Sequence, residues 1–361
     1  MPGASSSGGV LDLAAVAAFC DAHGIGSGRL RAERLGDGHS NLTFLVERGG
    51  ERFVLRRPPP PPLPPSAHDM VRESTVVAGL HRAGARVPRV LAVCADERVL
   101  GVPFYLMTLA AGEPLDAALP AAVDVPGERA RLGRDVVCAL AEVHAIDPAA
   151  AGLAGIGRPE GYLRRQVRRF TGLWEVNRTR DLPLVAEVGA FLAATVPASG
   201  PATVVHGDYR VGNLLVASTP PARVTAILDW ELATLGDPLA DLGYLVSTYA
   251  DRDTPPGEGI VALSPATRAA GFPTRAELAT LYAERTGRSV EGLAWYEALA
   301  HWKAAIFCEN MYKRFLAGER SDDFARAMET GVPAKLEAAA AAAARYDRSA
   351  GSCRPPHPTR P

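Results

Sequence analysis

The sequence lacks the features that mark membrane, secreted and nucleic-acid-binding proteins. No run of 18 apolar residues occurs in the 361-residue chain, so we expect no membrane partner and no membrane-spanning helix. The net charge of −1 lacks the basic excess that a nucleic-acid footprint needs. The five cysteines are scattered without a C-x-x-C pair, which fits a reducing cytoplasm better than a disulfide scaffold. Residues 1–9 have no basic or apolar segment, so we expect no secretory signal.

Several catalytic motifs are missing as well. The chain has no G-x-S-x-G elbow, no Walker A run ending in Gly-Lys-Ser/Thr and no H-E-x-x-H, which argues against the enzyme classes that use them. Gly24, Gly26 and Gly28 follow a helix-like segment rather than a strand, so they do not form a dinucleotide fingerprint. What remains is an ordinary globular composition, 47% apolar and 22% charged. The length allows two or three domains, or two lobes.

Two apolar runs deliver carboxylates and an amide to the middle of the chain. His206, Asp208 and Asn213 form an H-x-D-x-x-x-x-N frame, which is the protein-kinase catalytic-loop pattern. A second apolar run, 226–228, ends in Asp229. Phosphoryl transfer needs a carboxylate near the attacking hydroxyl and hard oxygen ligands for Mg²⁺. We therefore expect Asp208 to be catalytic, by orienting a substrate hydroxyl, and Asn213 and Asp229 to bind the metal.

The N-terminal third is expected to form a five-stranded sheet with one helix beside it, after a first helix over 10–23. Alternating apolar residues predict a hairpin of strands at 42–46 and 52–56, and further strands at 87–95 and 99–109. Helical spacing returns over 66–84, with Ser66 as a plausible N-cap. Seven prolines in 58–65 predict a stiff extended linker.

From about residue 110 onward the pattern is helical. We expect helices at 127–144, 161–177, 182–195, from 237, and at 275–286, 290–316 and 321–346. The expected division is an N-terminal nucleotide-binding lobe at 1–109 and a helical lobe at 110–346 with the catalytic loop and substrate site. A disordered tail is expected at 347–361, because its composition is rich in proline and polar residues.

The paired motifs resemble those of the aminoglycoside phosphotransferase and choline kinase-like family of small-molecule kinases. The family's versions are His-Gly-Asp at 206–208 and Asp-Trp-Glu at 229–231, followed by Gly-Asp-Pro at 236–238 and by Asp241. The segments at 54–59 and 157–162 are most similar to the branch that is fused to acyl-CoA dehydrogenases. The resemblance runs from about residue 35 to 346. It implies a protein-kinase-like α+β fold with a small antiparallel-sheet lobe and a larger, mostly helical lobe, and it implies ATP and Mg²⁺ as cofactors.

The resemblance also implies positions for the nucleotide. The phosphate-covering turn would contain Gly36, Gly38, Ser40 and Asn41. Arg56 stands where protein kinases keep a lysine, and Glu73 would be its ion-pair partner. An arginine can pair with phosphate through two hydrogen bonds, so the role can survive this change. The backbone of the linker from Met107 to Leu109 would bind adenine.

Two further residues are expected to support the catalytic loop. Asp241 resembles a buried aspartate that accepts backbone hydrogen bonds from the loop, although it could also simply cap the following helix. His206 is expected to order the loop by hydrogen bonding rather than to transfer a proton.

The acceptor is suggested by local charge. Between residues 158 and 180 the chain has seven arginines and two glutamates. This excess could be a solvated helix face, or it could attract an anionic substrate such as a carboxylate or coenzyme A. Aminoglycosides and choline are cations, so a basic wall argues against them. We expect a kinase that phosphorylates a hydroxyl of a hydroxy acid or hydroxyacyl-CoA. The alternatives are an antibiotic phosphotransferase and a non-catalytic nucleotide-binding scaffold.

Overall fold

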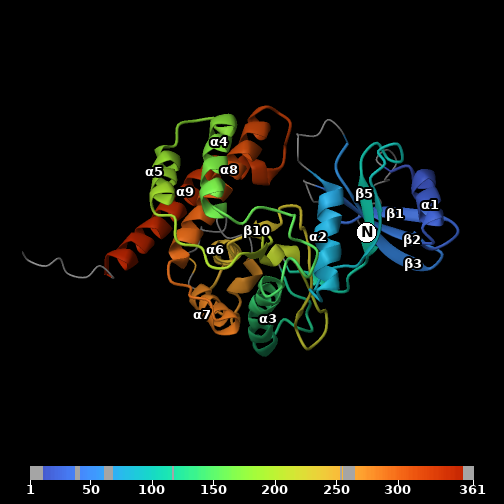
Figure 1. Cartoon of the computed structure of the whole chain (residues 1–361), viewed down its shortest axis with the longest axis horizontal. Helices are drawn as coiled ribbons and strands as arrows, with labels where there is room; N and C mark the ends of the chain where they lie inside the picture. The colour runs from blue at the N-terminus through green and yellow to red at the C-terminus, as the bar shows by residue number, and fades with distance from the viewer. Residues whose placement is uncertain are drawn as a thin grey trace, which may run out of the picture. The chain divides into compact units, whose positions relative to one another are not determined.

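The chain forms two compact units that are not consecutive in the sequence. The structure is a computed structural model and describes residues 11–36, 41–60, 68–115, 118–252, 254 and 265–352. Unit 1 contains Met1–Gly112 together with Ile146–Ile156 and Thr225–Ala233. Unit 2 contains Glu113–Ala145, Gly157–Val224 and Thr234–Pro361. Figure 1 labels the helices and strands of both units.

Unit 1 is built on a five-stranded antiparallel sheet in the order β1-β2-β3-β5-β4. Its elements are α1 (Leu13–Ala22), β1 (Leu30–Arg34), β2 (Leu42–Arg48), β3 (Glu51–Arg57), α2 (Met70–Arg82), β4 (Val90–Cys94) and β5 (Phe104–Thr108). The expected five-stranded sheet is confirmed, but β1 was not among the strands that the apolar pattern predicts. The reason is that β1 buries only Leu30, and the rest of this edge strand is largely charged.

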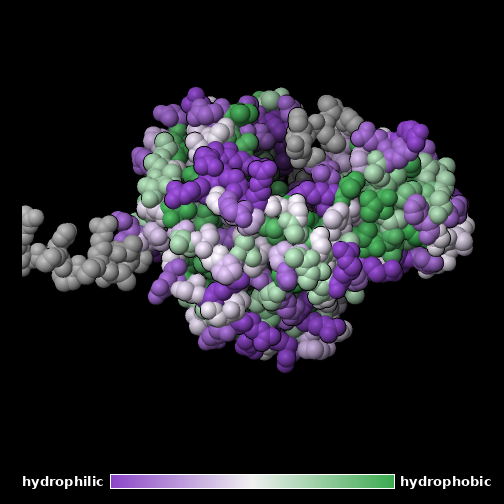
Figure 2. All heavy atoms as spheres, viewed as in Figure 1, coloured by the Kyte–Doolittle hydropathy of each residue, from purple (hydrophilic) through white to green (hydrophobic). Residues whose placement is uncertain are grey.

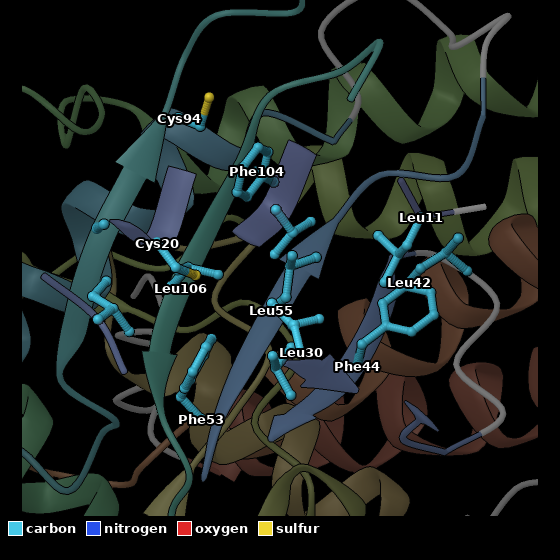
Figure 3. Close-up of a cluster of buried hydrophobic side chains, with 14 residues drawn as sticks. Leu11, Cys20, Leu30, Leu42, Phe44, Phe53, Leu55, Cys94, Phe104 and Leu106 are labelled. Atoms are coloured by element: carbon cyan, nitrogen blue, oxygen red, sulfur yellow. The ribbon is translucent and has the colours of Figure 1, made fainter. Parts of the chain in front are cut away.

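The two faces of the sheet carry separate apolar clusters, because successive side chains of a strand point to opposite faces. On β3, Phe53 and Leu55 join a cluster that includes Cys20 of α1. Figure 3 shows this cluster, with side chains from β2, β3 and β5 gathered over the sheet. Val54 instead packs with Met70 of α2 on the other face. Helices α1 and α2 therefore cover opposite faces of the sheet (Figure 1).

Two local signals fix the ends of elements in unit 1. The expected β2–β3 turn is confirmed, and Gly49 within it has φ 58°, where a Cβ atom would lie 2.5 Å from the Ser27 carbonyl oxygen. The start of α2 corrects the expected cap at Ser66. Asp69 is the N-cap, since its carboxylate accepts the backbone N–H of Arg72 at 2.9 Å. Of the proline-rich stretch 58–65, residues 61–65 lie outside the described residues.

Unit 2 is mostly helical, as expected. Its helices are α3 (Pro126–His144), α4 (Tyr162–Asn177), α5 (Pro183–Ala194), α6 (Leu239–Thr248), α7 (Arg275–Thr286), α8 (Leu293–Leu316) and α9 (Asp323–Ser352), with short 3-10 turns η1 (Val211–Asn213) and η3 (Pro265–Arg268). Helix α8 packs along α9 and against α6 and α4 and buries Trp295 and Trp302 completely. Helix α9 contains Pro333 and extends to Ser352, beyond the expected end at 346, since no proline or glycine occurs between Tyr346 and Gly351.

Short strands frame the segment that the sequence singles out. In unit 2, β7 (Thr203–Val205) pairs with β10 (Thr234–Gly236), and β6 (Glu113–Pro114) pairs with β8 (Leu214–Val216). The loop 206–213 thus begins at the end of β7 and ends at the start of β8. A further strand, β9 (Val224–Ile227), leads to Asp229. Within the described ranges, no helix is long and apolar enough to cross a membrane.

Candidate active site

In unit 1 a buried guanidinium is shared between two carboxylates. Arg56 on β3 places its Nε 3.0 Å from Oε1 of Glu73 on α2, and its Nη2 lies 2.5 Å from Oδ1 of Asp229. The Arg56 side chain is 12% exposed and that of Glu73 is 2% exposed. Burial opposes the charged form, but Glu73, Tyr105 and Asp229 together raise the pKa of Arg56. The expected ion pair is therefore present, and the guanidinium stays charged.

Asp229 adopts a backbone conformation that is uncommon for a residue other than glycine, with φ 66°. Aspartate tolerates this left-handed region better than most residues, and such conformations cluster at functional sites. Its side chain is 31% exposed. Within the described residues, Oδ1 contacts Arg56 while Oδ2 has no hydrogen-bond partner. A carboxylate oxygen of this kind is a suitable Mg²⁺ ligand.

The predicted phosphate-covering turn is described only in part. Gly36 has φ 67° and open space around its Cα, whereas Gly38 and Ser40 lie outside the described residues. Asn41 is buried, and its amide is fully engaged. Its Nδ2 donates to Glu231 at 2.7 Å, and its Oδ1 lies 2.8 Å from Nδ1 of His68. The side chain of Asn41 therefore anchors the end of this turn to the Asp-Trp-Glu segment.

Arg72 is a structural residue of unit 1 that the sequence reading missed. Its guanidinium donates to the backbone carbonyls of Ile156, Glu231 and Ala233. These hydrogen bonds hold two segments that come from far along the chain onto α2. The only signal in the sequence is that Arg72 directly precedes Glu73.

The residues predicted to contact adenine lie at the end of β5. Met107 is within β5, where it pairs with Val54 and packs against Val54 and Met70. Leu109 follows the strand directly and is 37% exposed. The backbone thus leaves the sheet at this point, which is where a nucleotide-binding linker is expected.

In unit 2 a buried aspartate holds the loop 206–213. Asp241 on α6 accepts the backbone N–H groups of His206 at 2.6 Å and Gly207 at 2.8 Å, and Nε2 of His144 lies 3.2 Å away. Burial opposes its charge, but the His144 hydrogen bond and the backbone bonds keep the pKa of Asp241 below its ordinary value. Gly207 has φ 87°, which favours glycine. The expectation that Asp241 supports the loop is confirmed.

The loop presents Asp208 in a fixed orientation. Nδ2 of Asn213 donates to the backbone oxygen of Asp208 at 2.9 Å and to its Oδ2 at 2.8 Å. Nδ1 of His206 accepts the N–H of Asp208 at 3.1 Å, which confirms that His206 orders the loop. Arg210 approaches Oδ2 at 3.6 Å. The Asp208 side chain remains 22% exposed, so it can still receive a hydrogen bond from a substrate.

Asn213 keeps its amide oxygen available for a metal. Both hydrogen bonds of its side chain use Nδ2, and Oδ1 has no partner in the part of the chain that the structure describes. An amide oxygen is a hard ligand that suits Mg²⁺. No group of three or more His, Cys, Asp or Glu side chains within the described ranges could hold a metal by itself. A Mg²⁺ ion at Asn213 or at Asp229 would take further ligands from phosphate and water.

Tyr244 is a further neighbour of Asp208 that the sequence analysis missed. Burial together with the nearby Asp208 carboxylate raises the pKa of Tyr244 well above its ordinary value. Its spacing from Asp241, three residues along α6, places both on one helix face and could have indicated it. Asp237, in contrast, is structural, since Oδ2 accepts the Tyr296 hydroxyl at 2.8 Å.

The arginine-rich segment lines an open pocket, and Arg158, Arg168 and Arg169 in its lining are exposed. A hollow of about 490 Å³ is lined by Arg158, Tyr162, Arg165, Gln166, Arg168, Arg169 and Thr234. No carboxylate lines it. Arg165 is bound to the backbone carbonyls of Arg158 and Glu160. Figure 2 shows hydrophilic side chains gathered over α4, which contributes most of the lining.

Close backbone packing positions this pocket. A Cβ atom on Gly157 would lie 2.1 Å from the Thr234 hydroxyl, and one on Gly236 would lie 2.8 Å from the ring of Tyr162. Glycine is therefore required at both positions for the segment 157–162 to lie against β10. The segment singled out in the sequence thus sets the distance between α4 and β10.

Comparison with known proteins identifies the family. A model of the phosphotransferase enzyme family matches residues 31–281. The chain belongs to this phosphotransferase family. It is 35% identical to acyl-CoA dehydrogenase family member 11 of Gallus gallus over 322 residues, which are 86% of this chain and 40% of that protein. The chain thus spans less than half the length of this relative, and the expected resemblance to the acyl-CoA dehydrogenase-linked branch is confirmed.

Solved structures of the phosphotransferase family share the fold. A candidate aminoglycoside phosphotransferase from Ralstonia eutropha matches with a TM-score of 0.74 at 29% identity, covering 91% of this chain and 98% of that one. A choline kinase from Cryptosporidium parvum matches with a TM-score of 0.64 at 13% identity, covering 95% and 99%. The second likeness shows the fold alone. Together with the sheet and helices described above, these matches confirm the expected kinase-like α+β fold.

Proposed function

We propose that this phosphotransferase is an ATP- and Mg²⁺-dependent kinase that phosphorylates a hydroxyl of a small anionic substrate. Family membership supports the phosphotransfer chemistry. The arrangement of Asp208 supports the residue roles, because Asn213 binds its carboxylate, His206 accepts its backbone N–H, and the carboxylate remains open to a ligand.

In the proposed reaction, Asp208 accepts a hydrogen bond from the acceptor hydroxyl and orients its oxygen. That oxygen forms a bond to the γ-phosphorus, and the bond between this phosphorus and the β–γ bridging oxygen breaks, so that ADP leaves. The hydroxyl proton passes to the Asp208 carboxylate and then to solvent. Positioning and charge neutralisation supply most of the acceleration in such reactions.

For the nucleotide, we assign Arg56 to the phosphates, since its guanidinium is charged and retains N–H groups beyond those that bind Glu73 and Asp229. Asp229 and Asn213 would hold Mg²⁺, which neutralises phosphate charge when bound. The turn that contains Gly36, Gly38, Ser40 and Asn41 would cover the phosphates through its backbone amides. The backbone from Met107 to Leu109 would bind adenine.

For the acceptor, we favour a hydroxy acid or a hydroxyacyl-CoA. The observation that carries this choice is the pocket along α4, whose arginines have no carboxylate in the lining. A cationic antibiotic or choline would be repelled there. Similarity to a protein named as an acyl-CoA dehydrogenase family member supports a coenzyme A thioester as one form of the acceptor.

The test is ATP consumption with Mg²⁺ over a panel of acceptors. The panel contains four-carbon hydroxy acids with the hydroxyl at carbon 2, 3 or 4, their coenzyme A thioesters, kanamycin and choline. We expect ADP and a phosphorylated product, identified by mass spectrometry, with at least one acid or thioester. Turnover of kanamycin or choline alone would overturn the acceptor class. Nucleotide binding without transfer to any acceptor would favour a non-catalytic scaffold.

A further inference from the structure

Lys303 is a half-buried cation in the middle of α8, a helix whose surrounding turns are apolar. Its Nζ lies 4.9 Å from the centre of the Phe170 ring on α4, a cation–π contact. No carboxylate oxygen lies within 4.0 Å of this ammonium group among the described residues. Buried charges in proteins are usually paired. This lysine therefore has an attraction for anionic groups that the fold leaves unused.

The position of Lys303 connects it to the catalytic loop. A small hollow is lined by Lys303 together with Gly207, the residue before Asp208, and by Tyr244 and Asp241. The Asp208 carboxylate lies near Tyr244 and acts on its hydroxyl electrostatically. Lys303 and the Asp208 carboxylate thus share Tyr244 as a neighbour. An acceptor whose hydroxyl reaches Asp208 would pass close to this ammonium group.

The same hollow shares a lining residue with the arginine pocket. Tyr162 lines both, and Arg169 of the larger pocket acts electrostatically on Lys303. Burial and Arg169 lower the pKa of Lys303 to about 8, while Asp241 and Asp208 oppose this shift. Because the charged form of Lys303 is destabilised in this way, an anionic ligand stabilises it more than it would stabilise a solvated lysine.

We propose that Lys303 determines acceptor specificity by binding a carboxyl-derived oxygen a few atoms from the hydroxyl that Asp208 orients. This oxygen belongs to the carboxylate of a hydroxy acid or to the thioester carbonyl of a hydroxyacyl-CoA. The inference rests on the proposed kinase function, and it assigns the arginines of the pocket to charges farther from the reacting hydroxyl.

The proposal explains why the lysine stands in an apolar helix without a protein partner. A lysine with a purely structural role would be expected to pair with a carboxylate or a backbone carbonyl, as Lys313 does ten residues later on α8, where its Nζ donates to the carbonyl of Val176 at 2.7 Å. Lys303 instead rests on an aromatic face, which holds the ammonium group in place but leaves its N–H donors available.

The test compares Lys303→Met with Lys303→Arg and with the matched control Lys313→Met. Initial rates are measured with four-carbon hydroxy acids and their coenzyme A thioesters as the varied acceptors, and separately with ATP as the varied substrate. We expect Lys303→Met to raise the acceptor KM about 10- to 100-fold, the range for a lost charge-assisted hydrogen bond. The KM for ATP should stay within about twofold, and Lys303→Arg should recover part of the acceptor affinity.

The outcomes separate this inference from the kinase proposal. An unchanged acceptor KM in Lys303→Met, or an equal rise in the KM for ATP, overturns the role of Lys303. If wild type transfers no phosphate, the kinase proposal fails, and calorimetric binding of the same acids and thioesters then decides the role of Lys303 alone. Binding to wild type that is lost in Lys303→Met supports it, and binding that persists or is absent in both overturns it. If Lys303→Met does not fold, Lys303→Gln replaces it.

Discussion

The cations of the two units have different surroundings: unit 1 has a buried arginine, whereas unit 2 has an exposed arginine and a half-buried lysine. In unit 1, Arg56 contacts two carboxylates, Glu73 and Asp229, so its position is fixed and its charge is already balanced. In unit 2, Arg169 and Lys303 have no carboxylate within 4.0 Å among the described residues. A balanced cation can hold a ligand in one geometry, whereas an unbalanced cation attracts a ligand that brings its own negative charge. This difference agrees with the proposed roles, in which unit 1 binds the nucleotide and unit 2 selects an anionic acceptor.

The largest expected effect is the loss of turnover when Asp208, the proposed catalytic residue, is replaced. Asp208→Asn should lower kcat about 10²- to 10⁴-fold, because an amide cannot take the hydroxyl proton. The melting temperature should change little, since Asp208 is partly exposed and the loop is held mainly by Asp241. Steady-state kinetics and thermal unfolding measure both quantities, with the exposed Asp323→Asn as the control. A kcat within threefold of wild type would remove Asp208 from its role.

The second prediction tests how much Arg56, whose charge is balanced by two carboxylates, contributes to stability. Arg56→Met should destabilise unit 1 by about 3 kcal/mol or more, because it leaves the buried Glu73 carboxylate without its partner. The change Arg169→Gln in unit 2 should leave stability within about 0.5 kcal/mol, since this arginine is exposed and no carboxylate depends on it. Urea denaturation of both variants measures the contrast.

The double variant Arg56→Met with Glu73→Gln serves as the control for this pair. It should recover much of the stability, because the unpaired charge is gone. Equal losses in Arg56→Met and Arg169→Gln would contradict the difference between the units.

The sequence predicted the hydrogen-bonded arrangement of the loop 206–213 far better than it predicted the surroundings of Lys303. The frame of His206, Asp208 and Asn213 depends on spacing within one short segment, so its geometry is largely local. The Arg56–Glu73 pair could also be predicted, because the kinase-like resemblance supplies its position. Lys303 could not be predicted, since its surroundings depend on how α8 packs beside α4 and the loop, which no local sequence pattern encodes.

Smaller differences from the predicted fold have local causes. β1 lacks a buried apolar alternation because it is an edge strand, and only Leu30 is buried. The cap of α2 falls on Asp69 rather than Ser66, since a carboxylate nearer the first apolar turn competes for the same backbone N–H groups. Polar residues close to a helix start can each cap it, and the tertiary context decides between them.

The third prediction concerns the pH dependence of the acceptor KM, which should follow the charge of Lys303. With a pKa of about 8, Lys303 loses its proton as the pH rises through that value, so the acceptor KM should increase about tenfold per pH unit above it. Arg169, Asp208 and Asp241 act electrostatically on Lys303; Asp241, whose pKa is lowered, stays ionised over this range, and the tyrosines that line the hollow have raised pKa values. Acceptor KM values from pH 6.5 to 10 measure the effect. In Lys303→Arg this alkaline rise should disappear, and its persistence there would assign it to another group.

The smallest expected effects belong to the exposed arginines of the pocket. Arg158→Gln, Arg168→Gln and Arg169→Gln should each raise the acceptor KM about two- to fivefold, because solvent screens exposed charges. Arg178→Gln at the end of α4 is the control, since Arg178 lies outside the lining and pairs with Glu175. The effects should shrink between 20 and about 500 mM salt, where the Debye length falls below the spacing of such groups.

If the three changes alter the KM of a coenzyme A thioester and not that of the free hydroxy acid, the arginines bind the coenzyme A phosphates. Equal effects on both acceptors would mean instead that the pocket acts as a general positive field, and the selection that distinguishes unit 2 from unit 1 would then rest on Lys303.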